Sequence, residues 1–308
     1  MLRLLNKINH AFLFSFLFSI ILLLIFMPLG SLVRIALVQF TPQPAQVSQN
    51  LLIASALCGQ KKADVWLFPH LFSIGADAAG VESFGRMAEE ENGPTPSFLR
   101  KLAMEKKAYA IGSYLALNPA APKLPFVRSV AYNSDGIRVA SYDQIHLSSI
   151  TGESTHLSAG ERLPFFDCLT FRSAMFSSYD LRFPELAREF GLSWGFFLFV
   201  QGAFRQDEIH QWDALLQARA AENQMFVIGC NFSHSPDSAE ENPFGGHSAV
   251  YDPAGKKQHQ AGTNDQVLIL DIDPFQVEWN RNRHQHLTDS KMKLAHRFVF
   301  ESEEDPDK

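Results

Sequence analysis

Three short segments of this chain place polar residues of reactive type among aromatic and apolar neighbours. They are Trp66-Leu-Phe-Pro-His70, Tyr142-Asp-Gln-Ile-His-Leu147 and Ser177-Ser-Tyr-Asp-Leu-Arg-Phe-Pro-Glu-Leu186. A serine hydroxyl such as that of Ser178 is a weak nucleophile and needs a strong base beside it. The imidazole of His70 can be such a base, and the amide of Gln144 can donate a hydrogen bond without bringing charge. Together these residue types could support nucleophilic attack on a carbonyl carbon.

The same three segments resemble the Glu, Lys and Cys motifs of the nitrilase, or carbon–nitrogen hydrolase, superfamily. The family pattern has Glu where His70 stands, Lys where Gln144 stands and Cys where Ser178 stands. Glu153, in Thr151-Gly-Glu153, matches an accessory carboxylate of the family and could orient His70 if the two side chains approach. The resemblance therefore preserves the surroundings of a catalytic triad and replaces its three members.

The resemblance also implies what the replaced residues would do. In the family a Cys thiolate attacks a carbonyl or nitrile carbon, a Glu acts as general base, and a Lys stabilises the oxyanion. A hydroxyl at position 178 is far less acidic than a thiol, and an amide at position 144 carries no positive charge. The residues at these positions are therefore poorly suited to the family's own reaction.

Two later segments extend the resemblance, which runs from about Val33 to Phe300. They are Gln217-Ala-Arg-Ala-Ala-Glu-Asn-Gln224 and Gly245-Gly-His-Ser-Ala-Val-Tyr-Asp-Pro-Ala-Gly255. The overall pattern is similar to the ω-amidase branch of the family. It implies an α/β fold, a four-layer α-β-β-α sandwich over residues 33–300, and a homodimer formed through helices on one sheet face.

Two interpretations of the reaction centre remain open. In the first, which we favour, the protein is a pseudoenzyme that binds a small amide- or acid-like ligand or acts as a dimeric scaffold. In the second, Ser178 with His70 as its base hydrolyses amide or ester bonds. The second interpretation requires a ring nitrogen of His70 within hydrogen-bond distance of Ser178 Oγ. An imidazole differs from a carboxylate in reach and shape, so substitution alone is a poor way to meet that requirement.

The spacing of apolar residues predicts strands that alternate with helices, which is typical of sheets covered by helices. Strands are predicted at 33–40, 63–68, 108–116, 169–176, 195–200 and 226–231, and helices at 50–60, 97–107, 183–190 and 209–223. Hairpins are predicted at 129–142, with a turn at Asn133-Ser-Asp-Gly136, and at 247–270, with a turn at Asp252-Pro-Ala-Gly255. Ser178 would then lie in the turn between a strand and a helix.

Several other polar residues have structural roles as their expected function. Asp180, Arg182 and Glu185 follow Ser178 and are expected to hold its turn through charge-assisted hydrogen bonds, with a substrate-carboxylate clamp as the alternative for Arg182. Arg219 and Glu222 lie three residues apart on a predicted helix and could form an ion pair. The three cysteines, Cys58, Cys168 and Cys230, have no metal-site spacing and are expected to be buried free thiols.

An apolar segment precedes the predicted domain. Residues 11–29 carry no charge, and Arg3 and Lys7 lie in the short basic tail 1–10. About 20 apolar residues can cross a bilayer as a helix, and basic residues mark the cytoplasmic end. This pattern predicts a membrane anchor with the domain on the non-cytoplasmic side. A cleaved signal peptide is one alternative, and translation from Met27, which would give a cytoplasmic protein, is another.

Composition limits the classes of partner. The chain has 33 acidic and 27 basic residues, a net charge of −6, which argues against a nucleic-acid-binding protein. Its histidines and cysteines show no metal-ligand spacing, so no metal or other cofactor is predicted. The segment 301–308, Glu-Ser-Glu-Glu-Asp-Pro-Asp-Lys, is acidic and is predicted to be a disordered tail.

Overall fold

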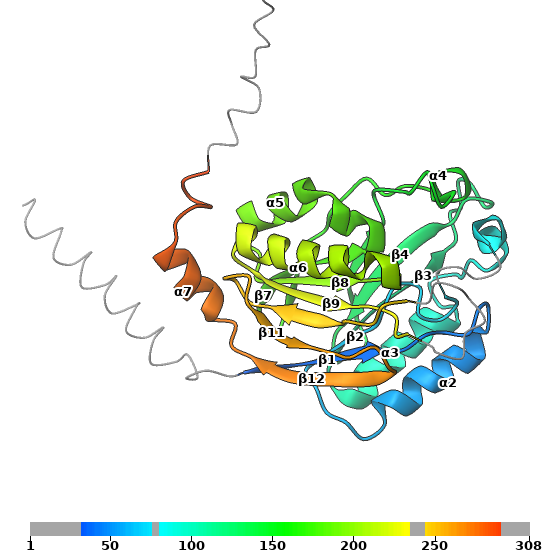
Figure 1. Cartoon of the computed structure of the whole chain (residues 1–308). Helices are drawn as coiled ribbons and strands as arrows, with labels where there is room; N and C mark the ends of the chain where they lie inside the picture. Colours follow the sequence, from blue (N-terminus) through cyan, green and yellow to red (C-terminus); the bar gives the residue numbers. More distant parts are fainter. Residues whose placement is uncertain (1–31, 76–79, 235–243, 291–308) are drawn as a thin grey trace, which may run out of the picture.

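Two six-stranded sheets pack face to face in the computed structural model, which describes residues 32–75, 80–234 and 244–290 (Figure 1). The first sheet has the order β12 (Gln266–Ile272), β1 (Val33–Gln39), β2 (Val65–Leu67), β3 (Tyr109–Ala116), β4 (Phe126–Tyr132) and β5 (Arg138–Asp143). The second has the order β11 (Lys257–Gln260), β10 (Ala249–Tyr251), β9 (Phe226–Cys230), β8 (Phe197–Gln201), β7 (Phe171–Ser177) and β6 (Phe166–Cys168).

Helices cover the outer face of each sheet. The first sheet is covered by α2 (Val47–Cys58) and α3 (Pro94–Lys106), and the second by α5 (Pro184–Leu192) and α6 (Ile209–Asn223). The remaining short helices are η1 (Val81–Arg86), α4 (Glu153–His156), η2 (Ser178–Arg182), η3 (Gln206–Glu208) and α7 (Gln276–Arg283). The α/β class and the layered arrangement of two sheets flanked by helices are thus confirmed.

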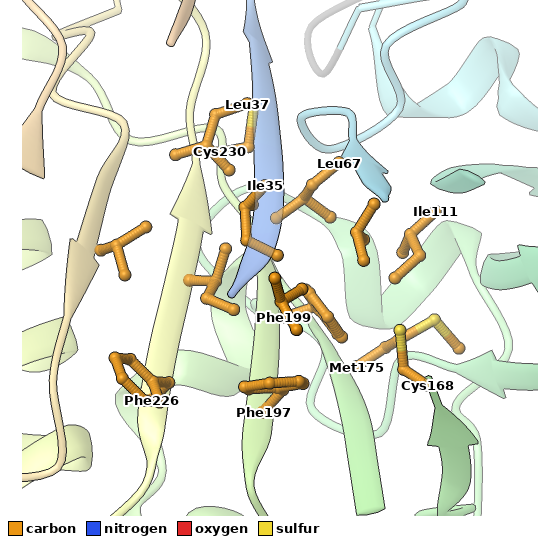
Figure 2. Close-up of a cluster of buried hydrophobic side chains, with 14 of the residues drawn as sticks. Ile35, Leu37, Leu67, Ile111, Cys168, Met175, Phe197, Phe199, Phe226 and Cys230 are labelled. Carbon is orange, nitrogen blue, oxygen red and sulfur yellow. The ribbon is translucent and has the colours of Figure 1, made fainter. Parts of the chain in front are cut away.

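The central strands are apolar on both faces because each face is buried. In β1, Ile35 and Leu37 point into the cluster between the two sheets, whereas Ala36 and Val38 pack under α2 and α3. Phe197 lies in the same inter-sheet cluster, which Figure 2 shows. Burying one such side chain contributes about 1.5–3 kcal/mol, so this double-sided burial holds the strand ends, and the loops they carry, in fixed positions.

One predicted hairpin is wrong in part. The segment 247–270 forms a hairpin only between β10 and β11, with the predicted turn at Asp252-Pro-Ala-Gly255. The next strand, β12, leaves for the other sheet and pairs antiparallel with β1. Its residues explain the exchange, because Leu268 and Ile272 are buried between the sheets while Val267 and Ile269 pack toward the helices of the first sheet. A strand that is apolar on both faces suits a two-sided layer better than an exposed hairpin edge.

The predicted membrane-anchored localisation is corrected here. No helix within the described residues is long and apolar enough to cross a membrane; α6, with 15 residues, falls short of the about 20 that a span requires. The segment predicted to span, residues 11–29, lies outside the described residues, as do the tails 1–10 and 301–308.

Candidate functional site

A cavity of about 650 Å³ opens at the ends of the central strands of both sheets. Its polar lining is His70, Ser148, Thr151, Glu153, Ser178, Arg182, Arg205 and Glu208. Its apolar lining is Ile150, Tyr179, Ala203, Phe204 and Phe244. Three of the four predicted site residues therefore face one cavity. The fourth, Gln144, is fully buried behind it.

His70 is held from two sides in the loop that follows β2. Its backbone N–H donates to the carbonyl of Gly202, at 3.2 Å, which ties this loop to the end of β8 in the other sheet. Its ring Nδ1 lies 2.9 Å from the hydroxyl of Ser177. Burial lowers the pKa of His70 to about 3 because the charged imidazolium loses its hydration. The imidazole is therefore neutral throughout the physiological pH range.

The serine that contacts His70 is Ser177, whereas the predicted partner was Ser178. In β7, Met175 faces the inter-sheet cluster, and side chains alternate along a strand, so Ser177 also points between the sheets. Ser178 begins η2 and faces the cavity. No hydrogen bond joins His70 to Ser178 within the part of the chain that the structure describes. Within the described residues, Ser178 faces the cavity without a hydrogen bond to His70, whereas Ser177 bonds to His70 and is fully buried.

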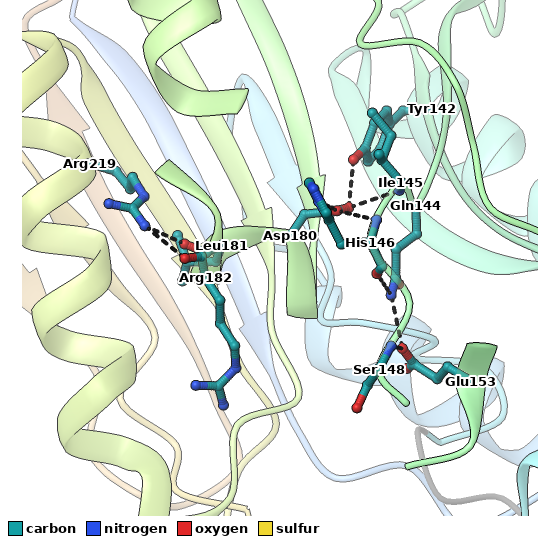
Figure 3. Close-up of polar contacts among 10 residues, drawn as sticks. All are labelled: Tyr142, Gln144, Ile145, His146, Ser148, Glu153, Asp180, Leu181, Arg182 and Arg219. Atoms are coloured by element: carbon teal, nitrogen blue, oxygen red, sulfur yellow. Dashed lines mark hydrogen bonds and ion pairs between the residues drawn. The ribbon is translucent and has the colours of Figure 1, made fainter. Parts of the chain in front are cut away.

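Both N–H donors of the Gln144 amide are engaged. Its Nε2 donates one hydrogen bond to the carbonyl of His146, at 2.8 Å, and one to Glu153 Oε2, at 3.2 Å (Figure 3). The same Oε2 accepts from the backbone N–H of Ser148, at 2.9 Å. A primary amide has two N–H donors, so Gln144 keeps none for an oxyanion in the cavity.

Glu153 is oriented by Gln144 and Ser148, and within the described residues it makes no contact with His70. Burial raises the pKa of its carboxyl group, and the two donors lower it by less. The suggestion that Glu153 orients the imidazole is therefore not realised in these contacts. Instead its carboxylate fixes the segment that follows β5, which carries Gln144.

The buried carboxylate of Asp180 joins the segments that carry Gln144 and Ser178. It accepts hydrogen bonds from the hydroxyl of Tyr142, at 2.5 Å, and from the backbone N–H and ring Nδ1 of His146, at 2.8 and 2.9 Å (Figure 3). Asp180 lies in η2 beside the second sheet, whereas Tyr142 lies in β5 of the first sheet and His146 in the segment that follows β5. The predicted holding role of Asp180 is confirmed, and its extension across both sheets was not foreseen.

Arginines fix the far side of the same turn. Arg219 donates to the carbonyls of Leu181 and Arg182, at 3.0 and 3.3 Å (Figure 3). It also forms the predicted ion pair with Glu222, at 3.1 Å. Arg182 reaches the cavity but pairs with Glu208, at 2.7 Å, and lies over the ring of Phe204. These contacts match the structural role expected for Arg182 better than a free carboxylate clamp.

The described lining of the cavity offers two arginines as cations, Arg182 and Arg205, and no thiol. The described lining of the cavity contains neither cysteine nor lysine. Cys58, Cys168 and Cys230 are buried, as predicted, and burial raises the pKa of each thiol, that of Cys58 to about 12. A thiolate, the reactive form, is therefore strongly disfavoured at all three positions.

Comparison with known proteins places these observations in a family. Residues 34–281 match the carbon-nitrogen hydrolase family. The 2-oxoglutaramate amidase of Bacillus subtilis (strain 168) is 30% identical over 244 residues, 78% of this chain and 90% of that protein. The omega-amidase NIT2 of Mus musculus is 30% identical over 281 residues, 87% of this chain and 98% of that protein.

A solved structure has the same fold. It is a cysteine-to-alanine mutant of the amidase from Nesterenkonia sp. AN1 in complex with butyramide. It aligns with a TM-score of 0.74 and 24% sequence identity, and covers 89% of this chain and 100% of that one.

Proposed function

This chain belongs to the carbon–nitrogen hydrolase family, and we propose that it binds a small amide or carboxylic acid in its cavity without hydrolysing it. The observation that carries the proposal is that two adjacent serines lie on different sides of His70, one in the cavity lining and one in the core. Ser178 lines the cavity and has no base bonded to it within the described residues, while the buried Ser177 bonds to Nδ1 of His70. A hydroxyl without a base is a poor nucleophile at neutral pH, so the first step of an acyl transfer has no means of activation.

The oxyanion position supports the same proposal. A lysine there would supply positive charge where negative charge develops, often the largest electrostatic contribution to such catalysis. Gln144 is neutral, and both of its donors are taken by His146 and Glu153. A tetrahedral intermediate in the cavity would therefore receive no stabilisation from this side chain.

The ligand class follows from the lining and from the relatives. The cavity combines carboxylates, arginines, an imidazole and aromatic rings, which suits a small polar molecule with a short carbon chain. Relatives carry the names 2-oxoglutaramate amidase and omega-amidase, and the amidase from Nesterenkonia sp. AN1 holds butyramide. We propose a ligand of that size and polarity for this chain.

The test of inactivity is a hydrolysis assay with a matched variant. Ammonia release from monoamides and acid release from short esters are compared for the wild-type protein and for Ser178→Ala. We expect the two proteins to be indistinguishable from each other and from buffer. Turnover that disappears in Ser178→Ala would refute the proposal and establish the hydrolase described next.

A second candidate function is hydrolysis of an amide or ester by Ser178 with His70 as base. It has one observation in its favour, which is that Ser178, His70 and Glu153 line the same cavity. It needs a ring nitrogen of His70 to come within hydrogen-bond distance of Ser178 Oγ. That requires the bond to Ser177 to break or the other ring nitrogen to turn toward Ser178, so we rank it second.

Ligand binding is tested by thermal unfolding with a panel of small amides and carboxylic acids. A ligand at about 100 times its Kd stabilises the folded state by about 2.7 kcal/mol. For a domain of this size that raises Tm by roughly 5–10 °C. The control is Ala203→Phe, which fills the cavity from its wall and should abolish the shift. A shift that survives this substitution would place the ligand elsewhere.

We further propose that residues 33–300 act as one domain and associate as a homodimer through the helices of one sheet, as the family resemblance implies. Sedimentation equilibrium measures the state directly. A monomer at micromolar concentration would contradict the dimer and leave the ligand proposal standing.

A further inference from the structure

We propose that His70 presents a fixed N–H donor, at Nε2, to the cavity, and that Ser177 is the positioning residue that fixes this tautomer. The ligand atom that His70 takes is then an acceptor, a carbonyl or carboxylate oxygen, and not an amine. The part that concerns the ligand rests on the proposed ligand-binding function. The part that concerns the tautomer stands independently of it.

The first step is the protonation state of the ring. A neutral imidazole has one nitrogen that donates and one that accepts, and the hydrogen bond at one nitrogen decides the role of the other. His70 is 3% exposed, and its burial disfavours the imidazolium because the charged ring loses its hydration. The ring therefore carries one proton, on either Nδ1 or Nε2.

The second step is the proton of Ser177. Its side chain is fully buried, and within the described residues its hydroxyl contacts one polar atom, Nδ1 of His70 at 2.9 Å. If Nδ1 carried the ring proton, it would donate to Ser177 Oγ and leave the serine proton buried without an acceptor. If Nδ1 is bare, the serine proton is satisfied. The second arrangement has the lower free energy, so Ser177 Oγ donates to Nδ1 and the ring proton resides on Nε2.

The third step is the direction in which Nε2 points. His70 lines the cavity, and its Nδ1 is occupied by Ser177 on the core side. No described residue bonds to Nε2, and this atom is not among the buried side-chain atoms without a partner, so it is open to the cavity. It is therefore the ring nitrogen that a ligand in the cavity can reach.

This tautomer explains two properties of the site at once. An Nε2–H group cannot accept the proton of Ser178, so the bond from Ser177 removes the base that a hydrolase would need. The same group donates to an oxygen, while the carboxylate of Glu153, elsewhere on the lining, accepts from an N–H. A primary amide offers both a carbonyl oxygen, which can accept from Nε2–H of His70, and N–H groups, which can donate to Glu153.

The tautomer is tested by two-bond ¹H–¹⁵N spectra of the histidine rings, with the signals of His70 assigned through His70→Gln. We expect the pattern of an Nε2-protonated ring that stays unchanged between pH 5 and pH 8. An Nδ1-protonated pattern, or a ring that titrates in this range, would overturn the proposal. This measurement on the wild-type protein needs no activity and no ligand.

The role of Ser177 is tested by a matched pair of variants, Ser177→Ala and Ser178→Ala. Removal of the Ser177 hydroxyl should convert the His70 signals to the averaged shifts of two exchanging tautomers. Removal of the neighbouring hydroxyl at position 178 should leave them unchanged. An unchanged spectrum in Ser177→Ala would refute Ser177 as the residue that fixes the ring.

The ligand part is tested with two probes of equal chain length and opposite polarity, butyramide and butylammonium. Titration with butyramide should move the Nε2 and Hε2 signals of His70, and butylammonium should not. The reverse selectivity, or no shift with either probe, would overturn the assignment of an oxygen ligand. Failure of the proposed function would appear elsewhere, as ammonia release that depends on Ser178.

Discussion

Two groups of residues around the cavity differ in how they are bonded. In the supporting group, Asp180 accepts hydrogen bonds from Tyr142 and His146 that connect the two sheets, and Arg219 donates to the carbonyls of η2. In the reaction group, Nδ1 of His70 bonds to Ser177, and the two N–H donors of Gln144 bond to His146 and Glu153. The contrast teaches that the walls of this cavity are held by contacts that stabilise the fold, and that these contacts do not depend on the residues proposed to replace the family's catalytic groups.

The largest expected effect lies in the supporting group. Replacing Asp180 with Ala removes the acceptor of four donors and leaves the buried hydroxyl of Tyr142 without its partner; the other three donors are the backbone N–H groups of Ile145 and His146 and the ring Nδ1 of His146. Loss of one member of such a buried charged network costs about 3–5 kcal/mol. We expect the urea midpoint to fall accordingly, with Asp135→Ala, at an exposed turn, as the matched control. A loss no larger than that of the control would remove the distinction between the two groups.

Rebuilding the reaction group is the converse experiment. If the walls still hold a competent cavity, the triple variant His70→Glu, Gln144→Lys and Ser178→Cys should gain amidase activity. General-base and nucleophile contributions of this kind give on the order of 100-fold or more, so we expect at least about 100-fold over wild type in ammonia release. The control keeps the first two changes and carries Ser178→Ala. A folded triple variant without activity would mean that the cavity itself has departed from that of an amidase.

The pH dependence of stability separates His70 from its surroundings. Its pKa is lowered from 6.5 to about 3, so between these values the unfolded chain binds a proton that the folded chain does not. The contribution of His70 to the free energy of unfolding is therefore fully present above pH 6.5 and is lost as the pH falls toward 3. Between pH 7 and pH 5 the loss from this residue is roughly 2 kcal/mol.

That contribution is isolated by comparing the free energy of unfolding of wild type and His70→Gln at both pH values. Glu153, whose pKa is raised, contributes with the opposite sign in both proteins and cancels in the difference. An equal pH dependence in the two proteins would contradict a buried neutral imidazole at position 70.

The smallest expected effect concerns a buried amide next to the serine pair. Gln201, which pairs in register with Ser177, is fully buried, and neither its oxygen nor its nitrogen has a partner within the described residues. Replacing it with Met, an apolar residue of similar size, should stabilise the protein by about 1 kcal/mol.

The matched control for that change is Gln224→Met. The Nε2 of Gln224 donates to Asn280 Oδ1 and to the carbonyl of His284, so its loss should destabilise by about 1 kcal/mol. Urea unfolding measures both. Destabilisation by Gln201→Met would indicate that an ordered water satisfies the wild-type amide.

Much of the fold follows from local pattern. The helix at 209–223 and the turns at 133–136 and 252–255 were predicted where they occur, because apolar spacing and turn residues act over a few positions. The transfer of β12 to the other sheet was not predicted. The pairing partner of a strand depends on which sheet edge is free in the folded protein, and residues nearby in the sequence do not determine it.

The candidate site divides in the same way. The motif segments identified positions 70, 144, 153 and 178, and three of these face one cavity. Ser177 was overlooked as a partner of His70, although its two-residue spacing from Met175 could have placed it on the inner face of β7.

By itself the sequence determined the alternation of strands and helices and the elements that carry each loop, because these depend on short-range periodicity, while its resemblance to a family indicated the layers and the reaction positions. Only the tertiary structure decided which of two adjacent serines contacts the imidazole and which groups accept the two N–H donors of Gln144. Those choices depend on how two sheets stack, since stacking determines which strand ends lie opposite each other at hydrogen-bond distance.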